Sequence, residues 1–334
     1  MNCIQCGIPF SLHENGYLYI KSTEDLSELS FEFLGESVWV TEYDGYSRLI
    51  NKIENVRNCS SSSSAALSSK KVLPAFTVPV QQLMVRLQHS ETVSLIQSGS
   101  LISYLQPIIE LQKNGDLFGY ESLLRTGGEE QISPGILFSI AEQSGMLSLL
   151  DQRAREAAIK AKKEHIKQGI KSFINFLPST IYNPDFCLQH TFELVRKYDI
   201  DPADLVFEVV ETEKIENISH LKKVLETYKR EGMKVALDDV GAGFSTLEVL
   251  KMLNPDIVKI DRQFIDHCDQ ESRKQQFLAE VMKLSRELNI TVLAEGIERA
   301  EELEYCRTHG VHLAQGYLIG KPTQQPSIPK ELVK

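Results

Sequence analysis

Two adjacent carboxylates follow an apolar run in the segment KVALDDVGAGF, residues 234–244. The run at 235–237 is short and typical of a buried strand, and Asp238 and Asp239 come directly after it. Two carboxylates this close repel each other, and a bound cation relieves that repulsion. An exposed turn is the alternative, because Asp and Gly are common turn residues. The segment alone leaves both interpretations open.

Polar side chains also end the other apolar runs of this part of the chain. They are Glu121, Arg125, Asn175, Glu208, Glu211, Lys259, Asp261, Glu295, Glu298 and Gln315. Each one alone could be an ordinary surface residue, and Lys259 could simply pair with Asp261. Together they would place many carboxylates in one pit, where hard cations are needed to balance the charge. Oxygen ligands without His or Cys favour Mg²⁺ or Mn²⁺ over Zn²⁺, and a cluster large enough for two ions indicates two-metal hydrolysis of a phosphate ester.

An alternation of strands and helices positions these side chains. The sequence predicts strands at 101–112, 117–125, 171–177, 204–211, 234–240, 256–261, 290–296 and 313–317. It predicts helices at 133–145, 147–168, 185–198, 217–231, 245–253, 271–289 and 299–309. The Asn-Gly turn in KNGD, residues 113–116, makes the first two strands antiparallel. Eight strands with helices between nearly all of them predict an α/β fold, a closed (β/α)₈ TIM-like barrel whose strand ends converge on one face.

The N-terminal residues 1–97 are expected to form a small α+β domain that precedes the barrel at 98–325, with a tail at 326–334. Short mixed segments at 16–21, 31–43 and 48–56 favour this class, and a helical pattern occupies 79–97. The Ser-rich stretch 59–71 predicts a flexible loop or linker. Cys3 and Cys6 could contribute to a Zn²⁺ or redox site, although a zinc site needs about four ligands, and two ordinary thiols are the alternative.

Composition limits the classes of function. The 334 residues carry a formal net charge of −10, which argues against a nucleic-acid polymer or a membrane surface as the partner. No apolar run is as long as a bilayer-spanning helix, and the N-terminus lacks the features of a signal peptide. The cytoplasm is therefore the expected compartment, and the six scattered cysteines are expected to be reduced.

Residues 100–325 resemble the EAL domain, a bacterial phosphodiesterase specific for cyclic di-GMP. The motifs that carry the resemblance are YLQPI (104–108), ESLLR (121–125), INFLP (174–178), FEVVE (207–211), LDDVGAGFSTL (237–247), VKID (258–261), AEGIE (294–298) and QGYLIGKP (315–322). The resemblance implies a barrel whose first strand is antiparallel, hydrolysis of one phosphodiester bond to give linear pGpG, and a homodimer formed through the barrel.

The resemblance also implies roles for individual residues. Two Mg²⁺ or Mn²⁺ ions would be held by Glu121, Asn175, Glu208, Asp238, Asp239 and Glu295, with Asp238 shared by both ions. The catalytic residues would be Glu121, Lys259, Glu295 and Glu211, the last as the anchor of the loop at 240–246. The substrate would be bound by Gln106, Arg125, Asp261, Glu298 and Gln315.

The chain departs from the family pattern at three positions. Ser122 replaces the Ala of the name-giving motif, Val210 replaces a usual Thr, and Leu177 replaces a frequent Ser. None of these changes removes an implied metal ligand. Because some relatives have lost catalysis, a non-catalytic cyclic di-GMP receptor or protein-binding regulator is the alternative to an enzyme. An unrelated barrel enzyme acting on sugars has no motif in its favour.

Overall fold

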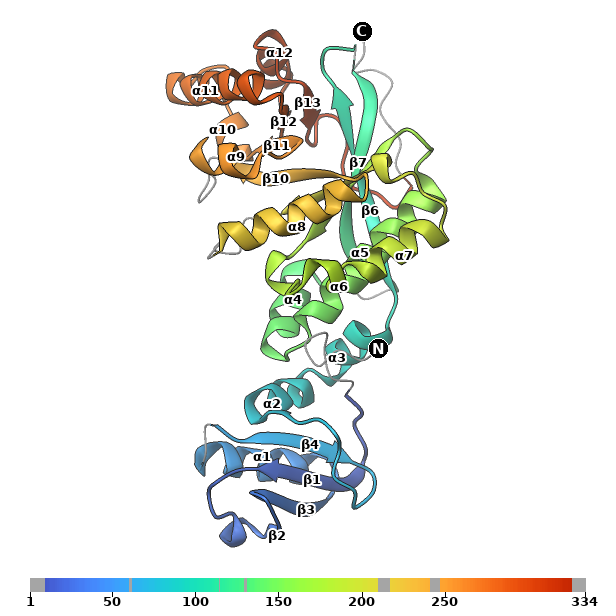
Figure 1. The fold of residues 1–334 in the computed structure, drawn as a ribbon, viewed down its shortest axis with the longest axis vertical. Coiled ribbons are helices and arrows are strands. Elements are labelled where there is room, and N and C mark those ends of the chain that lie inside the picture. The colour runs from blue at the N-terminus through green and yellow to red at the C-terminus, as the bar shows by residue number, and fades with distance from the viewer. Residues whose placement is uncertain are drawn as a thin grey trace. The chain divides into compact units, whose positions relative to one another are not determined.

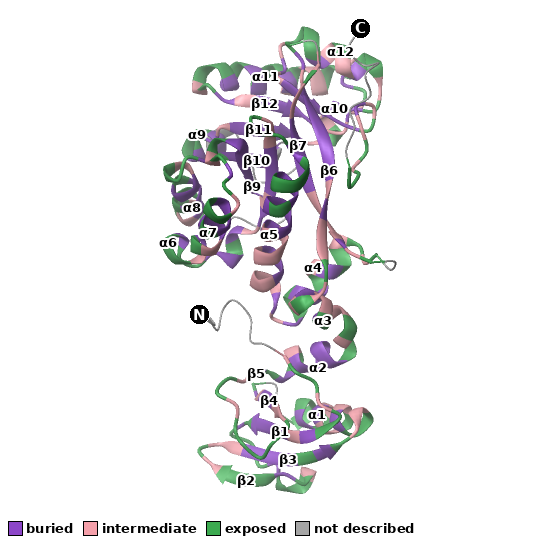
Figure 2. Ribbon diagram, turned by 90° about the vertical axis from the view of Figure 1, so that its right-hand side faces the viewer, coloured by how far each residue is buried: buried purple, intermediate pink, exposed green. Residues whose placement is uncertain are grey.

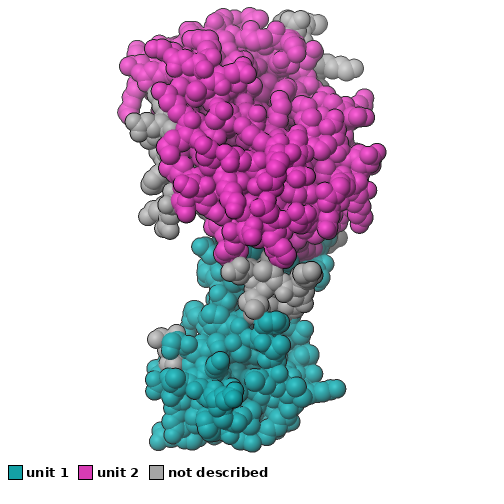
Figure 3. All heavy atoms as spheres, viewed as in Figure 1, with its two compact units in different colours: residues 1–100, 126–150 teal, residues 101–125, 151–334 magenta. Residues whose placement is uncertain are grey.

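A computed structural model describes residues 10–59, 62–113, 115–128, 131–209, 217–240 and 247–325. The chain divides into two compact units, shown in different colours in Figure 3. One unit contains Met1–Ser100 and Thr126–Leu150, and the other contains Leu101–Arg125 and Asp151–Lys334. This division differs from the expected single boundary after residue 97, because the helix at 134–143 packs with helices of the N-terminal unit.

The N-terminal unit is built on a five-stranded sheet with the order β2-β3-β1-β4-β5. Its strands are β1 (Asn15–Lys21), β2 (Glu32–Gly35), β3 (Val38–Asp44), β4 (Ser64–Ser68) and β5 (Val78–Pro79), and all four pairings are antiparallel. Its helices are α1 (Tyr46–Cys59), α2 (Val80–Gln88), α3 (Ser90–Ser98) and α4 (Pro134–Gln143), with a short 3-10 turn at Ser27–Leu29. Strand side chains such as Leu18 and Ile20 pack with Leu49, Ile53 and Val56 of α1, which confirms a small α+β unit.

One prediction for this unit is wrong. The Ser-rich stretch 59–71, expected to be a loop or linker, contains β4, and β4 pairs with β1 along Ser64–Ser68. Its apolar residues Ala65 and Ala66 are buried, so the neighbouring strand stabilises a segment whose serines hide its strand character. The helical pattern predicted at 79–97 is confirmed, and it forms two helices, α2 and α3, which are separated by His89.

The second unit is a closed barrel with the strand order β10-β11-β12-β13-β6-β7-β8-β9 (Figure 1). The strands are β6 (Leu101–Glu110), β7 (Asp116–Thr126), β8 (Lys171–Phe176), β9 (Leu205–Val209), β10 (Lys234–Val240), β11 (Ile257–Ile260), β12 (Thr291–Ala294) and β13 (Leu313–Gln315). Pairing is parallel from β7 to β13, and β6 is antiparallel to β13. The predicted TIM-like barrel with an antiparallel first strand is confirmed, although Asn114 of the predicted turn lies outside the described residues.

Helices connect the barrel strands. They are α5 (Leu147–His165), which begins in the N-terminal unit, then α6 (Pro184–Cys187), α7 (Gln189–Lys197), α8 (Ile218–Arg230), α9 (Leu247–Leu253), α10 (Arg262–Ile265), α11 (Ser272–Leu288) and α12 (Ala300–Thr308). Short 3-10 turns occupy Pro178–Thr180 and Pro202–Asp204. The predicted helix 185–198 is thus two helices, α6 and α7. No helix in the described parts of the chain is both long and apolar enough to cross a bilayer.

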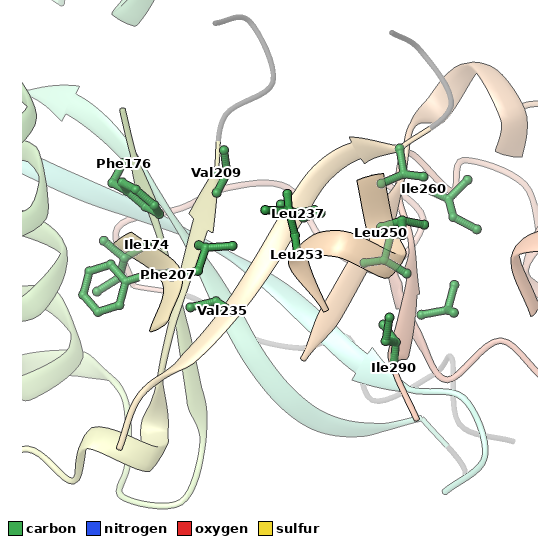
Figure 4. Packing of buried hydrophobic residues seen from close by; sticks show 14 of the residues in the cluster. Ile174, Phe176, Phe207, Val209, Val235, Leu237, Leu250, Leu253, Ile260 and Ile290 are labelled. Carbon is green, nitrogen blue, oxygen red and sulfur yellow. The ribbon is translucent and has the colours of Figure 1, made fainter. Parts of the chain in front are cut away.

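Strand side chains of the barrel alternate between two apolar layers. One set packs toward the helices and includes Ile174, Phe207 and Leu237; Figure 4 shows part of this cluster with Leu250 and Leu253 of α9. The other set fills the barrel interior and consists of Ile108, Phe173, Val206, Ala236, Ile257, Leu293 and Leu313. We call this second set the floor layer. In Figure 2 the barrel strands are largely purple, which marks them as buried.

Candidate active site

A layer of polar side chains follows the floor layer by two residues along each parallel strand. Each floor residue and its polar successor are Phe173 and Asn175, Val206 and Glu208, Ala236 and Asp238, Ile257 and Lys259, Leu293 and Glu295, Leu313 and Gln315. Because side chains in a strand alternate with a period of two, both members of each pair point into the barrel. Glu121 of β7 joins this layer, because its carboxylate accepts hydrogen bonds from Asn175 and Gln315. The strand period therefore concentrates seven polar groups at one end of the barrel.

Lys259 lies at the centre of this layer. Its Nζ is 2.7 Å from Glu295 Oε1, 2.9 Å from Glu208 Oε2 and 3.0 Å from Asp238 Oδ1. A fourth carboxylate oxygen, Glu121 Oε1, is 3.7 Å away. The Lys259 side chain is only 1% exposed. Four carboxylates thus surround one buried ammonium group, so three negative charges would exceed the charge of Lys259 when all four carboxylates are ionised.

Two amides orient Glu121. Asn175 Nδ2 donates to Glu121 Oε1 at 3.2 Å, and Gln315 Nε2 donates to Glu121 Oε2 at 2.7 Å. Two oxygens of the layer, Glu208 Oε1 and Gln315 Oε1, are buried and have no hydrogen-bond partner among the described residues. Burying an oxygen without a partner costs free energy, so both atoms are suited to coordinate a cation or to accept a hydrogen bond from a ligand.

The pKa values reflect the excess of negative charge. Burial raises the pKa of Glu208 well above its usual range; Lys259 opposes this, and the charges of Glu121 and Asp238 add to it. Burial also raises the pKa of Glu295 well above its usual range, against the effect of Lys259 and with that of Asp238. Burial alone would lower the pKa of Lys259, but the surrounding carboxylates outweigh it and raise that pKa well above its usual value.

Glu121 behaves differently from its neighbours. Burial alone would raise its pKa, but the charge of Lys259 and the hydrogen bonds from Gln315 and Asn175 outweigh this effect and lower it. The protein itself therefore stabilises the charged form of Glu121, while Glu208 and Glu295 require a further positive charge.

The layer fits divalent cations. It offers carboxylate and amide oxygens, no His or Cys among the residues of the layer, an excess of negative charge, and the partnerless oxygen Glu208 Oε1. Oxygen donors of this kind suit Mg²⁺, Mn²⁺ or Ca²⁺. Five of the six predicted ligands lie within this layer: Glu121, Asn175, Glu208, Asp238 and Glu295. The side chain of the sixth, Asp239, lies outside the described residues.

Comparison with known families decides the identity of the barrel. The family model described as the EAL domain matches residues 86–322. The chain belongs to the EAL domain family. The match begins inside α2 and spans the whole barrel, including all seven residues of the polar layer.

Curated relatives of this EAL protein include two from Escherichia coli. The probable cyclic di-GMP phosphodiesterase PdeG is 33% identical over 239 residues, which are 68% of this chain and 45% of PdeG. The cyclic di-GMP phosphodiesterase PdeF is 34% identical over 227 residues, which are 67% of this chain and 30% of PdeF. The chain thus spans less than half the length of either relative.

Solved structures similar to the EAL barrel contain ligands. A standalone versatile EAL protein from Vibrio cholerae, in its c-di-GMP bound form, has a TM-score of 0.64 and 32% identity, covering 71% of this chain and 99% of that one. The Bacillus subtilis YkuI protein, in complex with substrate c-di-GMP and calcium, has a TM-score of 0.62 and 25% identity, covering 73% of this chain and 60% of that one.

Four other predicted site residues of the EAL barrel have contacts outside the polar layer. Gln106 Nε2 donates to the carbonyl of Gly320 at 3.2 Å, and the Arg125 guanidinium lies 5.3 Å from the ring centre of Tyr104. Asp261 caps α10 by accepting from the Gln263 N–H at 2.7 Å. Glu298 is exposed and pairs with Arg262 at 3.0 Å. The structure thus brings seven predicted side chains together and attaches these four to other partners.

Three predicted residues are not described by the structure. Glu211, the predicted loop anchor, lies outside the described residues, as does most of the loop it would hold, at 241–246. Cys3 and Cys6 of the predicted N-terminal metal or redox site also lie outside them.

Sequence reasoning missed a buried network beside the EAL site. Asp151 of α5 accepts from the Leu177 N–H at 3.0 Å and from Thr180 Oγ1 at 2.9 Å, just after β8 and its Asn175. Asp151 also pairs with Arg155 at 3.0 Å, with both side chains at most 4% exposed. The signal was available, because Asp151 and Arg155 are an opposite-charge i,i+4 pair on the apolar side of the helix.

Proposed function

We propose that this chain hydrolyses one phosphodiester bond of cyclic di-GMP to give linear pGpG, with two Mg²⁺ or Mn²⁺ ions as cofactors. The observation that carries the proposal is the buried layer in which four carboxylates from β7, β9, β10 and the end of β12 surround Lys259. Support also comes from relatives named as cyclic di-GMP phosphodiesterases and from a similar structure that holds this nucleotide with calcium.

The polar layer would hold the cations. Glu121, Asn175, Glu208, Asp238, Asp239 and Glu295 are the proposed ligands, and Asp238 is the one proposed to be shared. When bound, two divalent cations supply Lewis-acid activation of water and stabilise the charge that develops on the phosphate. The chain's own contribution is to fix this oxygen cluster in a buried pit and to balance part of its charge with Lys259.

Other residues would hold the nucleotide. Arg125 is proposed to bind the phosphate that does not react, since a guanidinium matches phosphate geometry through paired hydrogen bonds. Its position over Tyr104 restricts the side chain before substrate arrives. Gln106, Gln315, Asp261 and Glu298 are proposed to seat the bases and sugars.

The catalytic roles of Lys259, Glu295 and Glu211 also remain proposals. The Lys259 ammonium would orient the attacking water and offset charge, and Glu211 would anchor the loop after β10. We further propose that the barrel acts as a homodimer in the cytoplasm and that the N-terminal unit regulates it. The family to which the chain belongs favours these assignments.

Hydrolysis by the purified full chain tests the proposal. We expect the chain to convert cyclic di-GMP to pGpG in the presence of Mg²⁺ or Mn²⁺, and we expect no conversion after metal chelation. Chromatography of the nucleotides measures the conversion. Glu121→Ala should lower the rate at least about 100-fold, because it removes a ligand and the acceptor of two amide bonds. The matched control is Glu287→Ala, an exposed carboxylate of α11, which should retain activity.

The outcomes separate the proposal from its alternative. Binding of cyclic di-GMP without turnover in either metal would make the chain a receptor or regulator and refute hydrolysis. Near-normal turnover by Glu121→Ala would refute the assigned ligand set.

A further inference from the structure

The turn that follows β8 is fixed by a carboxylate from α5. Asp151 Oδ1 accepts from the Leu177 N–H at 3.0 Å, and Asp151 Oδ2 accepts from Thr180 Oγ1 at 2.9 Å. Thr180 ends the 3-10 turn Pro178–Thr180, and its own N–H donates to the Leu177 carbonyl at 3.1 Å. Asp151 therefore bonds to both ends of the segment 177–180, which we call the β8 turn.

Asp151 is itself held in one position. Arg155 of α5 donates to Asp151 Oδ2 through Nε at 3.2 Å and through Nη2 at 3.0 Å. Arg155 also donates to Thr191 Oγ1 of α7. The side chains of Asp151 and Arg155 are at most 4% exposed. A buried polar network whose members are hydrogen-bonded is rigid, so Asp151 can hold the β8 turn in a single arrangement.

The β8 turn begins two residues after Asn175, which is a proposed cation ligand. The pairing of β8 with β7 ends at Ile174, whereas its pairing with β9 continues through Asn175 to Phe176. Asn175 is therefore held in the sheet from one side, and the β8 turn is the next point at which this end of the strand is fixed. Movement of the turn would move Asn175 with it.

Asn175 needs a fixed position more than the carboxylates of the polar layer do. Its Nδ2 donates to Glu121 Oε1 at 3.2 Å, so its amide oxygen is the atom that it offers to a cation. A carboxylate attracts a cation by its full charge, which acts from any orientation. A neutral amide attracts a cation only through its dipole, which must be aimed at the ion. A small displacement of Asn175 would therefore weaken cation binding.

We propose that Asp151 is a positioning residue for the cation site, which fixes the β8 turn and through it aims the Asn175 amide oxygen at a divalent cation. Asp151 touches neither substrate nor cation in this role. The inference rests on the proposed function, because it requires the polar layer to bind cations. Side chains that orient a metal ligand in this way typically change metal affinity by about 10- to 100-fold.

Asp204 provides a matched control at the other end of the barrel strands. It is 3% exposed, accepts from the Gly169 N–H at 2.7 Å and pairs with Lys162 of α5 at 3.0 Å. Like Asp151, it is a buried carboxylate that joins a basic side chain of α5 to a backbone N–H. It directly precedes β9, whereas Glu208 of the polar layer lies near the end of that strand. Removing the Asp204 carboxylate should therefore destabilise the barrel without moving a cation ligand.

Binding of Mn²⁺ to the full chain, followed by the EPR signal of the free ion, measures the effect. Each variant is compared at a temperature at which its circular dichroism matches that of the unaltered chain. We expect Asp151→Ala to bind Mn²⁺ at least about 10-fold more weakly than the unaltered chain. Asp151→Asn should lose less affinity, because its amide oxygen can still accept from the Leu177 N–H. Asp204→Ala should bind Mn²⁺ as the unaltered chain does.

Unchanged Mn²⁺ affinity in Asp151→Ala would overturn the inference, and so would an equal loss in Asp204→Ala, which would reflect general destabilisation. If Asp151→Ala does not fold, Thr180→Val decides, because it removes the hydroxyl that donates to Asp151. We expect Thr180→Val to bind Mn²⁺ at least about 3-fold more weakly, and unchanged affinity would refute the role. Mn²⁺ binding without hydrolysis of cyclic di-GMP would refute the proposed enzyme, while these affinities would still decide the role of Asp151. An unaltered chain that binds no Mn²⁺ would overturn both.

Discussion

Replacing Lys259 by Met tests the charge balance of the polar layer directly. Met keeps the length and apolar stem of the side chain but removes the ammonium, so packing changes little. The variant leaves Glu121, Glu208, Asp238 and Glu295 facing one another without the cation that now lies 2.7–3.7 Å from them. We expect the barrel to be strongly destabilised when divalent cations are absent.

The size of the effect follows from the distances. At an effective dielectric constant of about 20, one contact near 3 Å has a gross Coulomb energy of about 5–6 kcal/mol. Desolvating the ammonium offsets several kcal/mol of the total, and removing one partner from a buried ionic group usually costs about 3–5 kcal/mol. For a barrel of this size such a loss lowers the unfolding midpoint by about 6–20 °C.

Thermal unfolding of the full chain, followed by circular dichroism in chelator and then in Mn²⁺, measures this loss. The difference in unfolding midpoint between Lys259→Met and the unaltered chain should be smaller in Mn²⁺ than in chelator, because bound cations neutralise the same carboxylates. The control is Lys160→Met, which removes a 46%-exposed ammonium paired with Glu156 and should change stability by less than about 1 kcal/mol. Equal midpoints for the two variants in chelator would show that Lys259 does not balance the cluster.

Two further predictions concern buried charges outside the polar layer. Asp151→Ala should cost about 3–5 kcal/mol of unfolding free energy, because it leaves Arg155 buried without its partner; urea titration measures this, and adding Arg155→Met should restore part of it. Burial would raise the pKa of Asp204, but its hydrogen bonds from Gly169 and Lys162 and the charge of Lys162 lower it. The stability that Asp204 provides should therefore be complete at neutral pH and be lost as pH falls below about 4. The unfolding free energies of Asp204→Asn and of the unaltered chain should then converge at low pH. A difference between these two free energies that stays constant down to about pH 2 would contradict the predicted sign.

The sequence was sufficient for the barrel and for the polar layer. Strand and helix order predicted the closed barrel, and the two-residue period of a strand accounts for why Glu208 and Lys259 point into its interior. The same reasoning was weaker for Asp261 and Glu298, because both residues come after their strands have ended. Beyond a strand end the alternation no longer applies, and these side chains pair with α10.

Features that depend on distant partners could not be predicted. Strand β4 exists because it pairs with β1, and its serines alone favour a loop. Asp151 acts on backbone 26 residues later in the chain, a contact that only the packed barrel brings about. The buried Arg86 lies in a segment whose helical pattern indicated only an apolar face.

The chain passes between its two compact units three times, after residues 100, 125 and 150. A deletion that removes residues 1–100 would therefore leave α4 attached to the barrel, with its apolar face of Leu137, Ile140 and Ala141 deprived of α2 and α3. Such an exposed face is an aggregation hazard. The family match begins at residue 86 and includes α3, so a cut near that residue would leave α3 in place beside α4, which a cut at residue 100 would not.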